Sequence, residues 1–353
     1  MGRILGLAFV ALLITFGVWL YYFLQAAGVF QDIKPRALEA CRTVSGVVGV
    51  EDLAIDTELG VAYLAGYDRR AGARGTVRGA VWVYDLNAPD AAPIDMTASA
   101  LPDGFAPHGI SLYRGADGKR TLFVINHAGG KHSIELFDVA GATLTHRRTV
   151  TGAALVAPND LVGVGADAFY VSNDHGNPTG WMRTAEDYLR LKLSTVQYFD
   201  GNAFSTALEN IGGANGINVS ADGRSLYLSA ASELTVYVYD RDPATAALKQ
   251  RAAVAVPGFA DNIDVLANGD LLLGVHTKIF DLLAHVGDAA KRSPSHILHL
   301  RADGKGSFAP ETIYYNDGAE LSGASVAAAS GKRLLIGPIF EAKVLDCTWA
   351  SAP

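Results

Sequence analysis

Polar residues interrupt this largely apolar chain at intervals of roughly fifty residues, and this spacing is the strongest constraint on its fold. Each interruption comes directly before a short run of small, apolar residues that is typical of a buried strand. The interruptions are Glu51-Asp52, His108, Asn159-Asp160, Asn215, Asp261-Asn262 and Ser322. A unit of this length fits one four-stranded propeller blade, whose innermost strand lines a central channel. We therefore predict an all-β chain that forms a six-bladed β-propeller, with these polar residues gathered at one mouth of its channel.

The segments between the interruptions have the pattern of short antiparallel strands. Runs such as Val61–Ala65 and Thr121–Asn126 are rich in residues that favour strands. The dipeptides Asp117-Gly118 and Asn268-Gly269 favour tight hairpins. Only the stretch 181–193 has a helical pattern, and two interpretations of it stay open. It is either a surface helix packed on a blade, or an amphipathic lid near the channel mouth that touches substrate or membrane.

The N-terminal segment differs from everything that follows it. The stretch Ile4–Leu24 is almost wholly apolar, and it is long enough to cross a hydrocarbon core of roughly 30 Å. A cleaved signal peptide would have a shorter apolar region and a small-x-small cleavage site, but Leu24 or Gln25 occupies the position that needs a small residue. We predict that residues 1–31 form an uncleaved signal anchor, a transmembrane helix, and that residues 32–353 form one propeller domain.

The chain has two cysteines, Cys41 and Cys347, one near each end of the soluble part. They are either two unrelated buried thiols or a disulfide that joins the first and last structural elements, which would require an oxidising compartment. Closing so long a loop would stabilise the fold by up to roughly 5–6 kcal/mol in the chain-entropy model. Together with the anchor, this favours a periplasmic or extracellular location.

The polar residues of the repeat offer a set of hard oxygen ligands. At one end of the channel they supply two carboxylates and three carboxamides, from Glu51, Asn159, Asn215, Asp261 and Asn262. Oxygen ligands without a thiolate suit Ca²⁺, which takes six to eight oxygens and would act here as a Lewis acid. Asp52 and Asp160 point the other way along their strands. They allow a second ion deeper in the channel, where it would tie blades together.

Two histidines lie on successive predicted strands of the second unit. His108 and His127 are either ordinary surface or satisfied histidines, or a pair that extracts a proton from water beside the ion. His175 and His276 are further candidates. The sequence has no Gly-x-Ser-x-Gly motif, which argues against serine-hydrolase chemistry. A net charge of -7 argues against binding nucleic acid through its phosphates.

Several motifs resemble the pattern of the serum paraoxonase/arylesterase lactonase family, in order from about Cys41 to Cys347. They are Gly49-Val50-Glu51-Asp52-Leu53, Pro107-His108-Gly109-Ile110-Ser111, Asn159-Asp160-Leu161-Val162, Ser172-Asn173-Asp174-His175, Ala214-Asn215-Gly216-Ile217-Asn218, Asp261-Asn262-Ile263 and Leu334-Leu335-Ile336-Gly337. The resemblance implies a six-bladed propeller with two Ca²⁺ ions and a retained N-terminal hydrophobic helix. It also implies hydrolysis of lactones, with aryl esters as secondary substrates.

The resemblance also assigns roles by position. Residues that match the ligands of the family's catalytic ion are Glu51, Asn159, Asn215, Asp261 and Asn262. Asp52, Asp160 and the backbone carbonyl of Ile110 match the ligands of the structural ion. His108 and His127 match the pair proposed to activate water, and Cys41 and Cys347 match the structural disulfide. The family's free-cysteine position is Val275 here, which excludes a catalytic thiol.

The sequence therefore predicts a membrane-anchored, calcium-dependent lactonase that acts on a small-molecule lactone or ester. One alternative is an arylesterase, or a sugar-lactone hydrolase of the related single-metal propeller type. Another is a non-catalytic, calcium-stabilised propeller that binds a ligand. The natural lactone, its chain length, the oligomeric state and the choice of His108 or metal-bound water as base are left open.

Overall fold

Six four-stranded antiparallel sheets form the body of the computed structural model, which describes residues 2–75, 77–97, 101, 104–141, 143–304 and 306–352. The first blade comprises β2 (Val50–Asp56), β3 (Val61–Gly66), β4 (Ala80–Asp85) and β5 (Ile94–Asp95). The second comprises β6 (Pro107–Arg114), β7 (Arg120–Asn126), β8 (Ser133–Ala140) and β9 (Thr143–Val150). The third comprises β10 (Pro158–Gly163), β11 (Phe169–Asn173), β12 (Ser194–Phe199) and β13 (Phe204–Ile211).

The remaining three blades complete the ring. The fourth comprises β14 (Ala214–Val219), β15 (Ser225–Ala230), β16 (Thr235–Arg241) and β17 (Leu248–Ala255). The fifth comprises β18 (Phe259–Val265), β19 (Leu271–His276), β20 (Ser295–Ala302) and β21 (Phe308–Asn316). The sixth comprises β22 (Ala324–Ser330), β23 (Arg333–Pro338), β24 (Lys343–Thr348) and β1 (Ala40–Ser45). Each innermost strand contacts the next, and β22 contacts β2, which confirms the predicted six-bladed propeller.

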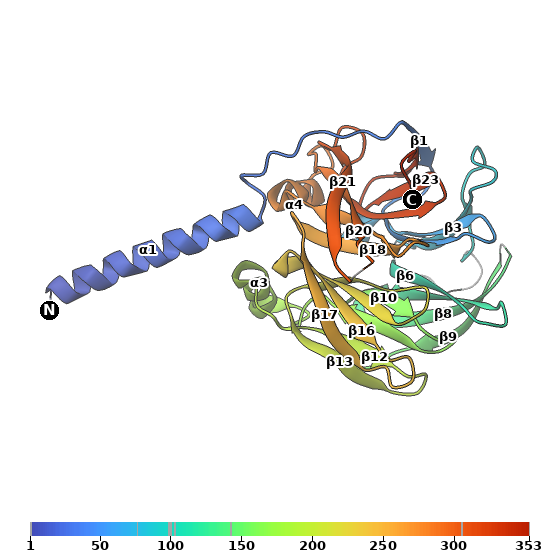
Figure 1. Cartoon of the computed structure of the whole chain (residues 1–353), viewed down its shortest axis with the longest axis horizontal. Coiled ribbons are helices and arrows are strands. Elements are labelled where there is room, and N and C mark those ends of the chain that lie inside the picture. The colour runs from blue at the N-terminus through green and yellow to red at the C-terminus, as the bar shows by residue number, and fades with distance from the viewer. Residues whose placement is uncertain are drawn as a thin grey trace.

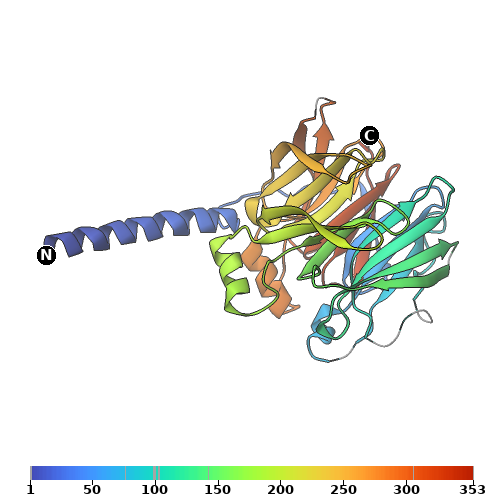
Figure 2. The ribbon, with the colours of Figure 1, turned by 90° about the horizontal axis from the view of Figure 1, so that it is seen from below.

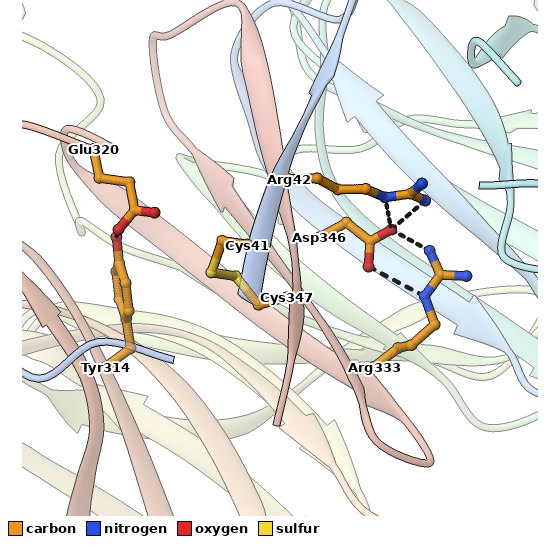
Figure 3. Close-up of a disulfide and its surroundings, with 7 residues drawn as sticks. All are labelled: Cys41, Arg42, Tyr314, Glu320, Arg333, Asp346 and Cys347. Carbon is orange, nitrogen blue, oxygen red and sulfur yellow. Dashed lines mark hydrogen bonds and ion pairs between the residues drawn. A yellow bond between two sulfur atoms is a disulfide. The ribbon is translucent and has the colours of Figure 1, made fainter. Parts of the chain in front are cut away.

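The sixth blade closes the ring by pairing the two ends of the propeller. Strand β1 runs antiparallel to β24 and places Cys41 opposite Cys347, and the two form a disulfide (Figure 3). Beside it, the guanidinium groups of Arg42 and Arg333 both bind the buried carboxylate of Asp346. The predicted disulfide is therefore confirmed, and it joins the first strand of the propeller to the last.

Apolar side chains fill the spaces between neighbouring blades and position the channel strands. Phe123 of the second blade packs against Phe169 of the third at a ring-centroid distance of 5.6 Å, and both are fully buried. Similar clusters join the other blades, as between Leu64 of the first and Leu335 of the sixth. This continuous packing holds the six inner strands rigidly around the axis.

Five of the six polar interruptions lie inside the innermost strands, which differs from their predicted position just before those strands. Ser322 does precede its inner strand, β22, as predicted. Each inner strand carries a register shift next to them, for example between Val50 and Asp52 of β2 and between Pro158 and Leu161 of β10. A bulge of this kind leaves residues out of the regular pairing and changes where their side chains point. The bulges therefore let adjacent polar residues serve different depths of the channel.

Helices gather at the end of the propeller where the N-terminal helix joins it (Figures 1 and 2). The helical elements are α1 (Gly2–Ala26), α2 (Arg69–Gly72), α3 (Gly180–Leu189), α4 (Ile279–Gly287) and the short turns η1 (Ala128–Gly130) and η2 (Ala231–Glu233). The predicted helix over 181–193 ends earlier, at Leu189, because Arg190 takes a left-handed conformation with φ of 52°. Helix α4 was not predicted.

Helix α1 projects away from the propeller and is apolar and long enough to cross a membrane (Figure 1). Its last turn contacts the body: Ala26 is buried, and the Phe23 ring packs against Tyr188 of α3 and Phe280 of α4. Such a helix near the N-terminus fits a membrane anchor or a signal segment. The division of the chain at residue 31 stays a prediction.

Candidate active site in the central channel

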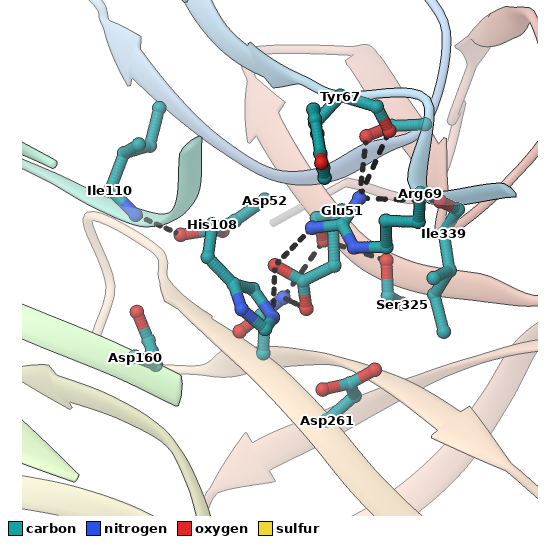
Figure 4. A network of polar contacts seen from close by, with 12 residues as sticks. Glu51, Asp52, Tyr67, Arg69, His108, Ile110, Asp160, Asp261, Ser325 and Ile339 are labelled. Carbon is teal, nitrogen blue, oxygen red and sulfur yellow. Dashed lines mark hydrogen bonds and ion pairs between the residues drawn. The ribbon is translucent and has the colours of Figure 1, made fainter. Parts of the chain in front are cut away.

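The channel brings together three of the side chains that were predicted to hold a catalytic ion, Glu51, Asp261 and Asn262. Asn262 donates hydrogen bonds from Nδ2 to the Glu51 side chain and to the Glu51 carbonyl, each at 2.9 Å. Glu51 lies 3.4 Å from His108 and 4.0 Å from Arg69 (Figure 4). Asp261 accepts a hydrogen bond from His276 Nε2 at 2.7 Å. Asp261, Asn262 and Glu51 are each at most 3% exposed, so these contacts are shielded from water.

Glycines in the inner strands let neighbouring strands approach closely at this level. A methyl group on Gly109 of β6 would lie 2.7 Å from the Asn159 carbonyl oxygen of β10. One on Gly216 of β14 would lie 2.3 Å from the Asp261 carbonyl oxygen of β18. Both distances are too short for any larger residue without movement of the backbone. These glycines therefore place the polar residues of adjacent blades next to each other.

Four side-chain oxygens in the channel are buried and have no hydrogen-bond partner. They are Oε2 of Glu51 and the Oδ1 atoms of Asn159, Asn215 and Asn262. Burying a polar atom without a partner costs about 1–3 kcal/mol, so four such atoms on the inner strands of four blades call for a common explanation. Carboxylate and carboxamide oxygens are the ligands that Ca²⁺ prefers. The residues present therefore fit a calcium ion at this position.

Carboxamide and backbone oxygens are essential to this interpretation. Among the described residues, no group of three or more histidine, cysteine or acidic side chains is arranged to hold a metal ion. A calcium site here would need the amide oxygens of Asn159, Asn215 and Asn262 as well as the carboxylates. Calcium accepts neutral oxygen ligands of this kind readily.

Asp52 and Asp160 lie deeper, beside a cavity of about 210 Å³ at the other end of the channel. Asp52 accepts a hydrogen bond from the Ile110 N–H, and Asp160 accepts one from the Ile217 N–H, both at 2.7 Å. These bonds tie the first blade to the second and the third to the fourth. The recorded contact of Ile110 is made by its N–H, and the predicted ligand role of its carbonyl stays a prediction.

The carboxylates of the channel repel one another when all of them are ionised. Burial raises the pKa of Asp52 well above its usual range, and the charges of Asp160 and Glu51 add to this effect. Burial likewise raises the pKa values of Asp160 and Asp261. Burial also opposes ionisation of Glu51, but His108 and Arg69 outweigh it and lower its pKa to about 2. A bound cation would relieve this repulsion.

Three histidines form a chain that leads away from Glu51. His108 Nδ1 lies 2.9 Å from His127 Nε2, and His127 Nδ1 lies 2.8 Å from His132 Nδ1. All three line a cavity of about 330 Å³ that is partly open to solvent. Burial lowers the pKa of His127 well below its usual range, and the charges of His108 and His132 act in the same direction. His127 is therefore neutral at pH 7.

The structure adds two residues that were not predicted from the sequence. Arg69 lies close to Glu51 and donates a hydrogen bond to the Gly49 carbonyl at 3.0 Å. His132 extends the histidine pair, as described above. Both lie outside the polar interruptions of the repeat, so the periodic signal did not point to them. A polar residue in a connecting loop has no periodicity of its own.

Another cavity, of about 350 Å³, lies beside Asn215 and is bordered by helices. Its lining includes Tyr188 of α3, Phe280 and Leu283 of α4, and Phe23 of α1. Of the two interpretations of the 181–193 stretch, this position supports a lid beside the channel mouth. Contact of α3 with substrate or membrane stays a prediction.

His175 fastens α3 to the propeller through two carboxylates. Its Nδ1 lies 2.8 Å from Asp174, and its Nε2 lies 2.9 Å from Asp187 of α3. Burial opposes a positive charge on His175, but the hydrogen bonds to Asp174 and Asp187 outweigh burial and raise its pKa to about 9. His175 is therefore charged at neutral pH and holds α3 as a cation between two anions.

This charge predicts a pH-dependent contribution to stability. Because the pKa of His175 is higher in the folded state, its contribution is complete below the unfolded value of about 6.5 and is lost as the pH rises through about 9. In urea unfolding, His175→Gln is expected to be less stable than the wild type at pH 6, with a difference that shrinks above pH 9. A difference that stays constant from pH 6 to pH 10 would contradict this assignment.

Comparisons with known proteins agree with the geometry. A family model described as Arylesterase matches residues 35–348. The chain is 28% identical over 326 residues to serum paraoxonase/arylesterase 2 of Bos taurus, covering 90% of this chain and 91% of the relative. It is 29% identical over 327 residues to serum paraoxonase/arylesterase 1 of Homo sapiens, with the same coverage.

Solved structures with low sequence identity share the fold. A luciferin-regenerating enzyme superposes with a TM-score of 0.56 at 14% identity, covering 88% of this chain and 96% of that chain. A gluconolactonase from Xanthomonas campestris superposes with a TM-score of 0.56 at 15% identity, covering 90% of this chain and 95% of that chain. At such identity these two structures support the propeller fold alone.

Proposed function

Since this chain belongs to the arylesterase family, we propose that it is a calcium-dependent lactonase with aryl esters as secondary substrates. The family relationship establishes a hydrolase of the lactonase/arylesterase type. The observation that carries the calcium proposal is the group of four unpartnered, buried oxygens on the inner strands, of which Glu51 Oε2 lies 3.4 Å from His108. The calcium-binding protein regucalcin from Agrobacterium tumefaciens, which shares the fold, agrees with the calcium proposal.

The proposed ligands fall into two sets. Those of the catalytic ion are Glu51, Asn159, Asn215, Asp261 and Asn262, and those of the structural ion are Asp52, Asp160 and the Ile110 carbonyl. When bound, the catalytic ion would polarise the ester carbonyl and stabilise the negative charge that develops on its oxygen. The guanidinium of Arg69, 4.0 Å from Glu51, favours the ionised carboxylate, which maintains a negative ligand at neutral pH.

The histidine pair supplies the base. His108 Nε2 lies 3.4 Å from Oε2 of Glu51, one of the unpartnered oxygens, while its Nδ1 lies 2.9 Å from His127 Nε2. This arrangement directs a free ring nitrogen toward the water that attacks the carbonyl. His127 orients the ring of His108 through this contact.

His108→Gln is expected to lower kcat by roughly 100-fold or more, the usual contribution of a general base, with little change in KM. The matched control is His146→Gln, a half-buried histidine on β9 that contacts Glu135 outside the cavity. Steady-state kinetics on a lactone and on phenyl acetate, with calcium content measured in each variant, provide the test. If His108→Gln with calcium bound had the kcat of the wild type, the His108–His127 pair would not be the general base.

The lining beside Asn215 favours a substrate with an apolar chain over a sugar lactone. Tyr188, Phe280 and Leu283 border that cavity, and their side chains bury alkyl groups better than hydroxyl groups. Rates on a long-chain alkyl lactone, phenyl acetate and a gluconolactone distinguish the three substrate classes. The highest kcat/KM is expected for the alkyl lactone.

We also propose that α1 anchors the enzyme in a membrane, with the propeller on the periplasmic or extracellular side. The Cys41–Cys347 disulfide supports this side, because disulfides persist in oxidising compartments. Release of the enzyme from membranes by carbonate washing alone would contradict a spanning anchor.

A further inference from the structure

We propose that His132 is a positioning residue for the base: it fixes the tautomer of His127 and receives the proton that His108 removes from water. The inference rests on the proposed function, because it assigns His108 as the base. It extends the histidine pair into a three-membered relay that ends at the rim of the cavity.

The backbone brings His132 back against His127. The chain leaves β7 at Asn126, makes the short turn η1, and enters β8 at Ser133. Gly129 and Gly130 both have positive φ, of 61° and 72°, which residues other than glycine rarely adopt. This turn reverses the chain, so His132 Nδ1 lies 2.8 Å from His127 Nδ1 with the two rings at 88°.

Hydrogen-bond pairing along the chain fixes where each proton sits. In each nitrogen–nitrogen contact one atom donates and the other accepts. His108 accepts a proton at Nε2 only if its resting proton is on Nδ1, where it donates to His127 Nε2. His127 then carries its proton on Nδ1 and donates it to His132 Nδ1. His132 must therefore offer an unprotonated Nδ1 and carry its own proton on Nε2.

Loss of an acceptor at position 132 reverses this order. The N–H on Nδ1 of His127 would be left without a partner in a buried place, which favours the tautomer with the proton on Nε2. That proton would face His108 Nδ1, which must then be bare. His108 would carry its proton on Nε2 and could not act as a base. His132 therefore determines, through His127, whether His108 Nε2 can accept a proton.

The same contacts let the proton move away from the reaction. As an O–H bond of water breaks, a new N–H bond forms on His108 Nε2, and the Nδ1 proton of His108 passes to His127 Nε2. The Nδ1 proton of His127 passes to His132 Nδ1, so the positive charge ends on His132. The reverse transfers return a proton to the leaving oxygen of the opened lactone, and all three rings regain their first tautomers.

His132 is a better place for the charge than His127. It is half-buried at the rim of the cavity, and it is less enclosed than His127. Asp174, on the loop after β11, attracts a positive charge on His132, whereas Arg183 of α3 and His108 oppose it. Burial, the largest effect, lowers the pKa of His132, so the ring is a neutral acceptor at rest.

Two substitutions separate orientation from proton transfer. In His132→Asn, Oδ1 replaces Nδ1 as an acceptor for His127 but cannot take up a proton. In His132→Phe, both functions are lost. The matched control is Lys131→Gln, an exposed neighbour in the same turn. With a lactone substrate, we expect kcat to fall roughly 10-fold in His132→Asn and roughly 100-fold in His132→Phe, with KM within about 2-fold of the wild type.

The pH profile and the solvent isotope effect distinguish a relay from a structural role. Protonation of His132 inactivates the wild type at low pH, so His132→Asn is expected to shift the acidic limb of the kcat profile to lower pH. In mixtures of H₂O and D₂O, the kcat of the wild type is expected to vary with the fraction of D₂O along a curve, because several protons move in one step. The kcat of His132→Asn is expected to vary linearly. Melting temperatures and calcium contents should match the wild type.

The outcomes separate this inference from the proposed function. Wild-type kcat in His132→Phe, or equal losses in both His132 variants with an unshifted acidic limb, would overturn the role of His132. If His108→Gln is impaired in the same assays, the proposed function stands without the relay. If His108→Gln also keeps wild-type turnover, the base itself is wrong and both fail.

Discussion

Excess EGTA is expected to abolish hydrolysis of both lactones and aryl esters and to lower the stability of the propeller. A lost Lewis acid removes several kcal/mol of transition-state stabilisation, and about 4 kcal/mol is a factor of roughly 1,000 in rate. Each ion at a concentration of about 1,000 times its Kd contributes about 4.1 kcal/mol to stability. Without cations, the electrostatic repulsion between the carboxylate of Asp52 and those of Asp160 and Glu51 is no longer offset. Activity assays and scanning calorimetry in EGTA and in calcium measure the two effects.

Readdition of metal provides the control for chelation. Calcium is expected to restore both activity and melting temperature, because it accepts six to eight oxygens in a flexible geometry. Magnesium is expected to restore neither fully, because it demands an octahedral site and gives up its waters reluctantly. If the protein were fully active after its calcium had been removed, the proposed mechanism would be wrong. The propeller fold would be unaffected by that result.

The architecture was predictable because the polar interruptions recur once in every blade. Residues such as Glu51 and Asp261 are conspicuous among apolar neighbours, and their spacing matches a four-stranded unit. Their position was predicted wrongly in five blades, because a run such as Pro158-Asn159-Asp160 has the composition of a turn. A β-bulge accepts the same residue types, since it also leaves residues outside the regular pairing.

Other features of the site depend on contacts that no local pattern records. Helix α4 was missed because a short apolar run such as Ile279–Gly287 is equally compatible with a buried strand. His132 was missed because its approach to His127 follows from the turn at Gly129 and Gly130. Arg69 lies in a connection outside the repeat, and only the folded channel brings it to Glu51.

Substitutions of the neighbouring residues Asn159 and Asp160 are expected to fail in different ways. Asn159 contributes an unpartnered oxygen to the proposed catalytic ion, so Asn159→Ala is expected to lower kcat by roughly 100-fold while most of the stability remains. Asp160 accepts the N–H groups of Ile217 and Leu161, both at 2.7 Å. Asp160→Ala leaves both donors unpaired, at about 1–3 kcal/mol each, and it also removes a ligand of the proposed structural ion.

Asp160→Asn separates the backbone contacts of Asp160 from its charge. The carboxamide oxygen still accepts one of the two N–H groups, so less stability is lost in EGTA than with Asp160→Ala. The gain in melting temperature on adding calcium is nevertheless expected to shrink, because a charged ligand that ties the third blade to the fourth is gone. In Asn159→Ala most of that gain should persist. If calcium stabilised both variants by equal amounts, the division of this pair between a catalytic and a structural ion would be wrong, because two adjacent side chains would then serve one site.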